Sequence, residues 1–491
     1  MVKATQKEKA RYQLLRQKLL DTYKGYFDTP LALPSCQKSG DESTLPTLGP
    51  GTENTQHRWD TLYPVLLKPT RHAALLNTFH GEPFFKQQIP STSTSPPSAD
   101  QTWNEAIQKS SLLVSPQHSV PDLLEDAAPW LPSTTCLRLY HFPQQQSHST
   151  KDYLLPPPSK NAHNLKNYYC LDFASIFPVL ALDPQPDETI LDMTAAPGGK
   201  TLAMLNHLAP SLLADSSSTT TTTTTTTTTV SRIIPRFHVN ELDFQRRKRL
   251  RVVLDEYVPP HLLPPSPSSS TSSSSSSQSI IQIMGKDATL DSSFRPETYD
   301  KILLDAPCSS ERHVLHQLHK QDSASNLHKD LLNWSPSSSD KTAKNLQLKM
   351  LVNAIHALKF GGTLVYSTCS ISPYENDGVV ENMLKVIDKQ NRKRVKEAAA
   401  RRRRNTGAHN QDGESHGEAE EEAEQGSRHP TNDEEPQPEL WKVEVVPTTW
   451  AIGEPTTHGW MILPDQQQGA GWGPIYFCKI VKTRKKRRGA S

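Results

Sequence analysis

Two cysteines in separate short signatures carry the most informative chemistry of this chain. Cys308 ends an Asp-Ala-Pro-Cys sequence that begins at Asp305, and Cys369 lies in a Ser-Thr-Cys-Ser sequence. Both follow a glycine-rich turn at residues 191–200, of the kind that approaches nucleotide-type cofactors. A thiolate that adds to carbon-6 of a cytosine makes carbon-5 electron-rich enough to take a methyl group, and a second thiol can help to expel the modified base. These residue types therefore fit carbon methylation of a pyrimidine.

The composition limits how much of the chain can fold. Only 34% of the 491 residues are hydrophobic and 40 are proline, so sizeable disordered segments are expected. The six cysteines include no CxxC pair, which disfavours a disulfide framework or a zinc module and predicts no metal. No apolar run reaches the length of about 18 residues that a membrane span needs, so no membrane partner is expected.

Strand-like and helix-like segments alternate from about residue 168 to residue 480. Short apolar runs predict strands at 189–193, 232–239, 280–284, 300–305 and 363–367, and further strand-like pieces at 441–446, 460–463 and 475–480. The intervening segments predict helices at 200–208, 243–257, 343–358 and 376–387, the third of them capped by Gly361 and Gly362. Consecutive apolar residues indicate strands buried on both faces, hence a doubly wound α/β domain with a parallel, Rossmann-like sheet.

The remaining segments define the predicted domain boundaries. Residues 1–56 read as a basic segment and a linker, residues 57–165 as a mostly helical subdomain, residues 166–481 as the α/β domain and residues 482–491 as a basic tail. The helical prediction rests on apolar residues at roughly helical spacing within residues 57–82, among them Ala74, Leu75 and Leu76.

Three inserts interrupt the α/β domain. They span residues 215–231, 259–279 and 389–439, and they are rich in threonine, in proline and serine, and in charged residues, respectively. None can bury enough apolar surface to fold alone, so all three are expected to be disordered. The third contains an arginine block, 401–404, that either contacts RNA phosphates or serves as an import signal, with tolerated loop expansion as the plainer interpretation.

The turn that follows the first predicted strand is built mainly from small residues. Its members are Thr194, Ala195, Ala196, Pro197, Gly198, Gly199 and Lys200. Such a turn lets backbone amides approach a ligand at the amino end of a helix. A tight strand-to-helix turn without a ligand is the alternative.

Acidic residues follow the next three predicted strands. Glu241 stands where a carboxylate can hold a ribose diol, and Asp287 stands where one can accept a hydrogen bond from an adenine amino group. Asp305 ends the fourth strand and can face the edge of a base. A single cysteine such as Cys308 would more often be a small buried residue. Two cysteines at the tips of neighbouring strands, however, place Cys308 and Cys369 in one cleft.

The signatures at 195–200, 305–308 and 367–370 together resemble those of the NOL/NOP/Sun (RsmB-like) family of S-adenosylmethionine-dependent RNA cytosine-5 methyltransferases. The similarity runs from about Tyr168 to Ile480, interrupted by the inserts. The Thr-Cys signature argues for RNA, because DNA cytosine methyltransferases use a single Pro-Cys nucleophile. Within the family, the chain looks most like the mitochondrial branch of ribosomal RNA and transfer RNA enzymes.

The resemblance implies a class I methyltransferase sheet and a role for each reactive residue. Cys369 looks like the nucleophile that adds to carbon-6, and Cys308 looks like the second cysteine, which assists release of the product. Asp305 would orient and polarise the cytosine and would also contact the cofactor. Lys200 is a candidate for the positive charge that lowers the pKa of the attacking thiol.

The resemblance also implies S-adenosylmethionine as the cofactor and residues to bind it. The turn at 194–200 would wrap its methionine end, Glu241 would hold its ribose and Asp287 would reach its adenine. Two residues depart from the family pattern. Thr194 stands where cysteine is usual, and Glu241 replaces the commoner aspartate, but neither change removes a catalytic group.

RNA is the partner that the resemblance implies. Mitochondrial small-subunit ribosomal RNA is the expected substrate, transfer RNA is the alternative, and an accessory ribosome-assembly protein stays open as a further partner. Basic residues in 57–165 and in the tail at 482–488 are expected to hold the RNA. A function from another class, a non-catalytic ribosome-assembly factor that keeps the fold as an RNA scaffold, is opposed by the two intact cysteines.

Two compartments fit the sequence. The branch resemblance predicts the mitochondrion, in the matrix, whereas the basic tail allows the nucleus or nucleolus. The basic segment 1–24, with Leu14, Leu15 and Leu19 as an apolar stripe, reads equally as a mitochondrial presequence or as a basic surface helix.

Overall fold

A computed structural model gives the structure of the protein. It describes residues 6–28, 58–70, 72–80, 137, 139–140, 157–214, 236–265, 279–320, 338–408, 440–450, 452–466 and 471–484. The predicted linker at 30–56 and the predicted insert at 215–231 lie outside these residues, as do residues 266–278 and 409–439 of the other two inserts.

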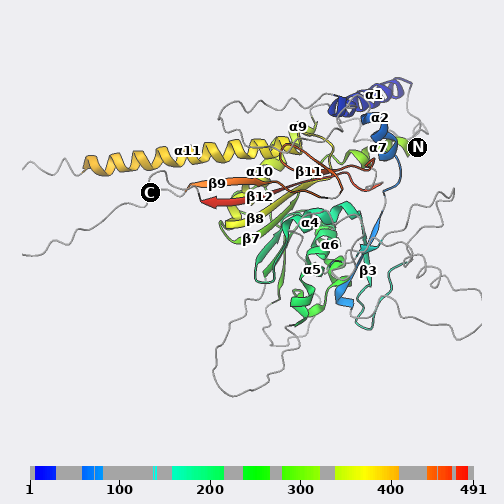
Figure 1. The fold of residues 1–491 in the computed structure, drawn as a ribbon, viewed down its shortest axis with the longest axis horizontal. Helices are drawn as coiled ribbons and strands as arrows, with labels where there is room; N and C mark the ends of the chain where they lie inside the picture. Colours follow the sequence, from blue (N-terminus) through cyan, green and yellow to red (C-terminus); the bar gives the residue numbers. More distant parts are fainter. Residues whose placement is uncertain are drawn as a thin grey trace, which may run out of the picture.

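One large mixed sheet forms the centre of the described fold (Figure 1). Its parallel strands, in spatial order, are β6 (Ile281–Met284), β5 (Arg236–Asn240), β4 (Thr189–Asp192), β7 (Tyr299–Asp305) and β8 (Leu358–Thr368). Antiparallel strands extend it beyond β8, namely β12 (Ile475–Arg484), β11 (Trp460–Ile462) and β10 (Glu454–Pro455), with β9 (Trp441–Val446) also paired to β12. The predicted parallel sheet is confirmed for the five strands that carry the site residues.

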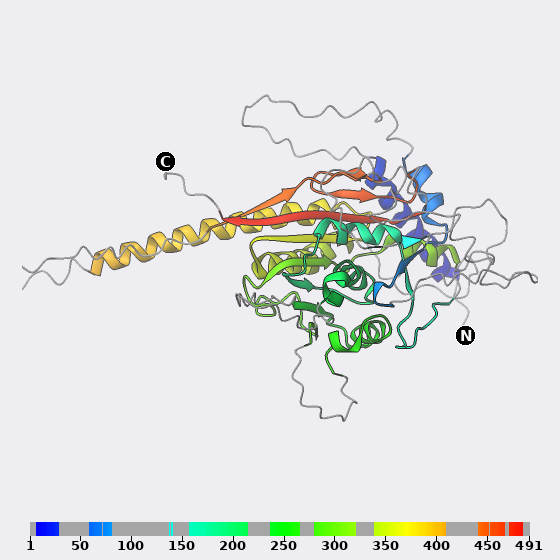
Figure 2. The ribbon, with the colours of Figure 1, turned by 60° about the horizontal axis from the view of Figure 1, so that its bottom comes forward.

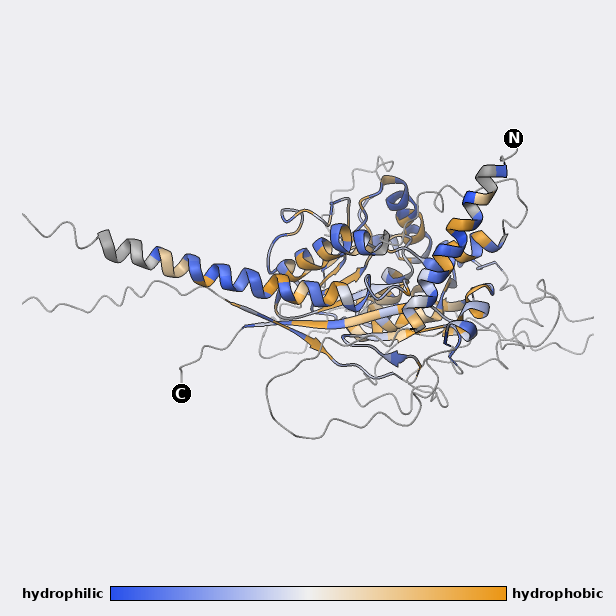
Figure 3. Ribbon diagram, turned by 90° about the horizontal axis from the view of Figure 1, so that it is seen from above, coloured by the Kyte–Doolittle hydropathy of each residue, from blue (hydrophilic) through white to orange (hydrophobic). Residues whose placement is uncertain are grey.

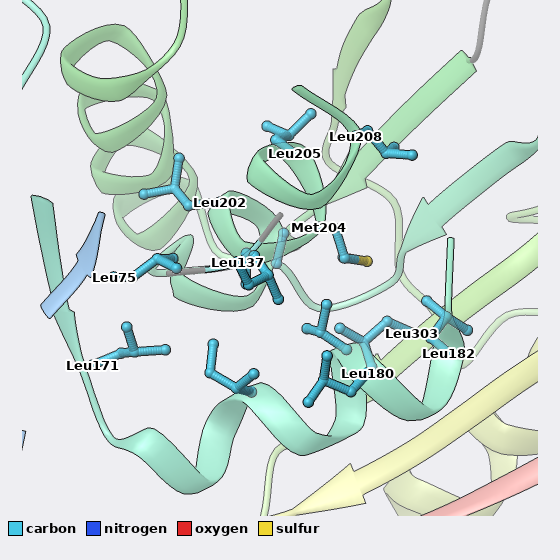
Figure 4. Close-up of a cluster of buried hydrophobic side chains, with 14 of the residues drawn as sticks. Leu75, Leu137, Leu171, Leu180, Leu182, Leu202, Met204, Leu205, Leu208 and Leu303 are labelled. Carbon is cyan, nitrogen blue, oxygen red and sulfur yellow. The ribbon is translucent and has the colours of Figure 1, made fainter. Parts of the chain in front are cut away.

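Helices cover both faces of this sheet (Figures 1 and 2). One face carries α4 (Phe177–Leu182), α5 (Gly199–Ala214) and α6 (Phe244–Tyr257), and the other carries α10 (Leu348–Ala357) and α11 (Asp377–Ala408). Figure 4 shows leucines of α4, α5 and β7 interlocking on the first face. Burial of apolar side chains on both sides explains the consecutive apolar residues of the central strands, and it confirms the doubly wound α/β fold.

Shorter elements connect these layers. They are η2 (Thr78–His80), η3 (Phe173–Ile176), η5 (Pro260–Leu262), α7 (Glu311–Lys320), α9 (Ser338–Thr342) and η6 (Ala343–Gln347). In the described part of the chain, no helix has the length and apolar character that a membrane crossing requires. Nor do the described histidines, cysteines and acids form a group of three that could hold a metal ion.

The predicted helical subdomain contains strands where it is described. Helix α2 (Arg58–Leu66) is present, but residues 73–76, which were expected to be helical, form β1 (Ala73–Leu76). Strand β1 pairs with β2 (Leu139–Tyr140) and β3 (Tyr168–Leu171) in a small antiparallel sheet. The prediction was wrong because a short, wholly buried apolar run has no periodicity that separates a strand from a helix.

The glycines at 361 and 362 do not cap a helix. Helix α10 ends at Ala357, and β8 begins at Leu358, so both glycines lie inside the strand. Gly361 has a φ of +82°, and a Cβ on Gly362 would approach the Asp300 carbonyl oxygen to 2.9 Å. The two glycines therefore allow the irregular pairing of β8 with the start of β7, instead of a helix end.

Three predicted disordered or tail segments begin with ordered structure. Helix α11 continues to Ala408 through the first part of the third insert and projects from the domain (Figure 3). Leu262 and Leu263, within the second insert, are buried in the core. Strand β12 runs to Arg484, and Lys482 of the predicted tail is fully buried, where its amine donates to the Leu358 carbonyl.

Helix α1 (Gln6–Asp28) packs against α2. Leu19 and Tyr23 are buried, and the Tyr23 ring meets the Trp59 ring edge to face. We therefore expect Leu19→Ala to lower the free energy of unfolding by about 2–5 kcal/mol, because the methyl groups leave a cavity. Leu14→Ala is the matched control, since Leu14 lies on the same helix and is 58% exposed. Equal urea midpoints for the two variants would contradict this packing.

Candidate active site

The candidate site lies at one edge of the sheet. Because β6, β5, β4, β7 and β8 are parallel, the residues that follow them gather at their carboxyl ends. The chain leaves β4 toward β5, whereas β7 lies on the other side of β4, so the order of connections reverses between β4 and β7. Ligands of open α/β sheets bind at such a switch point.

The predicted cofactor turn crosses this switch point. Thr194 donates its hydroxyl to the Asp305 carbonyl oxygen at 2.9 Å, which ties the end of β4 to the end of β7. Asp192, at the end of β4, is buried and accepts the Thr201 hydroxyl at 2.6 Å. Burial raises the pKa of Asp192 to about 7. The turn is therefore held by the Thr194 side chain on the backbone of β7 and by the hydrogen bond between the end of β4 and helix α5.

Gly198 is the residue of this turn that tolerates no side chain. Its φ is +120°, and a Cβ there would lie 3.0 Å from a Val253 methyl carbon on α6. We expect Gly198→Ala to cost about 1–3 kcal/mol in backbone strain and to weaken binding of S-adenosylmethionine. Calorimetric titration and urea unfolding measure both effects. Gly25→Ala, with nothing within 4 Å, is the control, and unchanged affinity in Gly198→Ala would show that the turn does not shape the cofactor site.

Two adjoining cavities open at the turn. The first, of about 210 Å³, is lined by the turn, by Asp192 and by residues of β3 and the loop after it, including Tyr169 and Asp172. The second, of about 480 Å³, contains Cys369. Lys200 and Asp305 line both cavities. The site therefore has space for two ligands on either side of one charged pair.

The first cavity lies at the turn that is predicted to wrap the methionine end of S-adenosylmethionine. Gly199 approaches the Tyr169 ring so closely that a Cβ would lie 3.1 Å from it, so a larger residue would fill the space beside the turn. Asp172 accepts the backbone amides of Ala174 and Gly473. Burial raises the pKa of Asp172 despite these hydrogen bonds. No motif pointed to Tyr169 or Asp172, because they lie in β3 and just after it, outside the turn.

Glu241 and Asp287 follow β5 and β6 at the same sheet edge, but they line neither cavity. Glu241 is buried; one carboxylate oxygen accepts the Asp243 amide at 3.0 Å, and the other lies 3.5 Å from Arg246. Asp287 accepts the amide and the hydroxyl of Thr289, which lower its pKa. Their predicted contacts with ribose and adenine stay predictions.

Lys200 and Asp305 form the charged pair between the cavities. The Lys200 amine lies 2.8 Å from one Asp305 oxygen, and the Ser367 hydroxyl donates to the other at 2.8 Å. Burial alone would lower the pKa of Lys200, but the Asp305 charge and hydrogen bond outweigh it and raise that pKa. Both oxygens of Asp305 therefore have a hydrogen-bond donor that fixes their direction beside the two cavities.

The two cysteines converge as expected from their strands. The sulfur atoms of Cys308 and Cys369 lie 3.1 Å apart, and the Ser310 hydroxyl lies 3.2 Å from the Cys369 sulfur. Hydrogen bonds from Cys308 and Ser310 lower the pKa of Cys369, whereas the same contact and burial raise that of Cys308. The geometry thus favours a Cys369 thiolate that accepts a hydrogen bond from a Cys308 thiol.

Ser310 was not predicted, although its backbone marks it as unusual. It has a φ of +49°, a left-handed conformation that is uncommon for residues other than glycine. The conformation aims its hydroxyl at the Cys369 sulfur. Lys200, the predicted source of the lowered thiol pKa, is paired with Asp305, and the largest lowering contributions at Cys369 come from Cys308 and Ser310.

A parallel sheet of this order, with ligand cavities at its switch point, is the fold of a Rossmann-like class I methyltransferase. Residues 274–414 match the family described as 16S rRNA methyltransferase RsmB/F. This segment is therefore similar to the RsmB-like methyltransferases, whose cofactor is S-adenosylmethionine, and it contains the signatures at 305–308 and 367–370.

Curated relatives agree with this assignment. A bovine 5-cytosine rRNA methyltransferase NSUN4 is 28% identical over 68% of this chain and 71% of its own. A zebrafish mitochondrial tRNA (cytosine(34)-C(5))-methyltransferase is 33% identical over 47% of this chain, and the match spans about half, 49%, of that relative's length. Among solved structures, NSun6 from Pyrococcus horikoshii with SFG is 15% identical, covering 88% of this chain and 96% of that chain with a TM-score of 0.44.

Proposed function

We propose that the chain is an RNA methyltransferase that forms 5-methylcytosine through a covalent bond between Cys369 and carbon-6 of the base. The observation that carries this proposal is the pair of sulfur atoms, 3.1 Å apart, in a site shared with Lys200 and Asp305. A single buried cysteine would have no such partner. Thiols this close, at the ends of adjacent parallel strands, suit a reaction that needs one to add and one to help release the product.

S-adenosylmethionine, when bound, supplies an electrophilic methyl group. The Cys369 thiolate forms a bond to carbon-6, and the electron pair of the carbon-5–carbon-6 double bond moves to carbon-5, which takes the methyl group. Asp305, fixed by Lys200 and Ser367, holds the base by its N3 or exocyclic amine. Loss of the carbon-5 proton to a base then restores the double bond and breaks the sulfur–carbon bond, and Cys308 assists this release.

The target base must leave its stack to reach the thiols. Cys369 lines a cavity of about 480 Å³, which is within the size range of small-ligand sites. We therefore infer that the cytosine lies in a single-stranded loop or is flipped out of a helix.

We propose ribosomal RNA of the mitochondrial small subunit as the substrate and the mitochondrial matrix as the location. The bovine relative, whose match covers 68% of this chain, is named as an rRNA enzyme, and the zebrafish and mouse tRNA enzymes are named as mitochondrial. Transfer RNA is the second candidate, favoured by the 33% and 31% identity to those two tRNA enzymes.

Co-purification of the protein from mitochondria tests for the predicted accessory ribosome-assembly protein.

The function is tested with S-adenosylmethionine that carries a labelled methyl group. The protein is incubated separately with small-subunit ribosomal RNA and with mitochondrial transfer RNA, and the digested nucleosides are separated. We expect label in 5-methylcytosine from ribosomal RNA. Label in transfer RNA alone would show that transfer RNA, and not ribosomal RNA, is the substrate. No label on any cytosine would favour a non-catalytic RNA scaffold, and nuclear localisation of a tagged chain would contradict the compartment.

A further inference from the structure

Two buried carboxyl groups lie directly behind the thiols. Glu311 begins α7, just after the Cys308 loop, and Glu375 follows the Cys369 loop. Both side chains are fully buried. Within the described residues, neither forms an ion pair with a lysine or arginine. Burying two ionised carboxylates without a counterion would cost folding free energy, so the contacts of Glu311 and Glu375 require an explanation.

Glu311 joins the two cysteine loops. The residue after each cysteine is a serine, and both serine hydroxyls reach the same Glu311 oxygen, Ser370 at 2.8 Å and Ser309 in a short contact. The other Glu311 oxygen accepts the Ile371 amide at 3.1 Å. One carboxyl group therefore binds the loop from β7 and the loop from β8, and it sets how the two sulfur atoms face each other.

The hydrogen bonds require a proton on the acid pair. The Ser309 hydroxyl also lies 2.6 Å from Glu375, but it has only one proton to donate. If Ser309 donates to Glu375, its contact with Glu311 needs a proton on Glu311. Glu375 accepts the Ser309 amide at 3.0 Å and the Gln347 amide group at 2.9 Å, which suits the charged member. Burial, and then the Glu375 charge, raise the pKa of Glu311 to about 7.

The other ionisable groups around the pair come from several elements. They are Tyr23 of α1, Tyr366 of β8, Cys308, Cys369 and the neighbouring Arg312 of α7. The Arg312 guanidinium donates to the carbonyls of Gly471, Gly473, Lys68 and Pro69. Burial, with the acid pair as a further cause, raises the pKa of Tyr23 and Tyr366, so both phenols stay neutral. Glu311 is thus the carboxyl group of this cluster whose pKa is raised to near neutral pH.

We propose that Glu311 is a positioning residue for the methyl transfer: neutral, and sharing its proton with Glu375 through Ser309, it holds the Cys308 and Cys369 loops together. The effect of Glu311 on methyl transfer rests on the proposed function, whereas its contacts with the two loops do not. Because the folded state favours the protonated acid, the stabilisation is complete at acid pH and is lost as the pH rises through about 7. Above that pH two charges face each other across Ser309, and the loops separate.

The test compares Glu311→Gln and Glu311→Ala. Glutamine keeps a donor toward Ser309 and a carbonyl toward the Ile371 amide but has no proton to lose, whereas alanine removes both contacts. Glu188→Gln is the matched control, because Glu188 is a partly buried acid with a raised pKa at the opposite end of β4. Its amide variant should behave as the wild type in every assay.

The first readout needs neither RNA nor cofactor. Diamide takes one hydrogen atom from each thiol and leaves a disulfide, and peptide mass spectrometry gives the rate of Cys308–Cys369 bond formation. We expect Glu311→Ala to slow this rate by about tenfold or more, because thiols displaced by about 1 Å lose their alignment. Glu311→Gln should stay within about threefold of the wild type at about pH 6 and should exceed it at about pH 8. An unchanged rate in Glu311→Ala would overturn the inference.

The second readout is the pH profile of methyl transfer. The ratio of Glu311→Gln to wild-type activity isolates the part of the pH dependence that comes from Glu311, including the effect of its charge on the pKa of Cys369. We expect this ratio to rise severalfold between about pH 6 and about pH 8, since only the wild type loses its shared proton. A flat ratio would show that Glu311 is merely structural. If the disulfide rates are as expected but neither the wild type nor any variant transfers a methyl group, the proposed function is wrong. The role of Glu311 in positioning the two loops would still be supported.

Discussion

Cys369→Ala is expected to abolish both product and covalent adduct, whereas Cys308→Ala should accumulate a stable protein–RNA adduct. Cys369 has the lowered thiol pKa and lines the second cavity, so no other described thiol can replace it there. Cys308 stays a thiol at neutral pH and can assist the breaking of the sulfur–carbon bond. Product formation should fall by about 10⁴-fold or more in Cys369→Ala, as for the loss of other catalytic nucleophiles.

Denaturing gels with labelled RNA measure this difference. Cys478→Ala serves as the control, because Cys478 is buried in β12 away from both cavities and should leave the turnover rate unchanged. If Cys369→Ala instead traps the RNA and Cys308→Ala is inert, the two roles are reversed.

Asp305→Asn is expected to lower kcat by about 10²–10⁴-fold, the usual contribution of a positioned acid–base group. The substitution removes the charge that pairs with Lys200 at 2.8 Å and leaves a largely buried ammonium group without its counterion. The asparagine amide can also rotate, so that its NH2 group faces the base where the carboxylate has an oxygen acceptor. Single-turnover rates at saturating RNA measure the effect.

Ser367→Ala separates the charge of Asp305 from its orientation. This variant removes only the hydroxyl that donates to the second Asp305 oxygen at 2.8 Å. Loss of one hydrogen bond of about 1 kcal/mol corresponds to about a fivefold effect. If Asp305→Asn is no more impaired than Ser367→Ala, the Asp305 charge has no part in catalysis.

The parallel strands and the reactive residues could be predicted because their signals are local. The strands β4, β7 and β8 contain consecutive apolar residues, and Asp305, Cys308 and Cys369 lie at or shortly after the ends of β7 and β8. In a parallel sheet, this alone brings the carboxyl ends together. The same logic places Glu241 and Asp287 at the shared edge, but it cannot determine whether a side chain at that edge faces a cavity.

Other parts of the site and fold depend on contacts between distant segments. Glu311 and Glu375 lie 64 positions apart and meet only because α7 and the loop after β8 pack together around Ser309. Asp172 lines the cavity from the position just after β3, a strand of the smaller sheet. The apolar run at 73–76 fits a helix or a strand equally well, and its pairing with β3 decides between them.

Trapping the intermediate tests most directly whether Cys369 bonds to the base. Substrate RNA that carries 5-fluorocytosine is incubated with the wild-type protein and S-adenosylmethionine, because fluorine cannot leave carbon-5 as a proton does. Peptide mass spectrometry should find a methylated fluorocytosine nucleotide attached to Cys369. An adduct on Cys308, or unmodified cysteines in protein that still methylates ordinary RNA, would contradict a covalent reaction at Cys369.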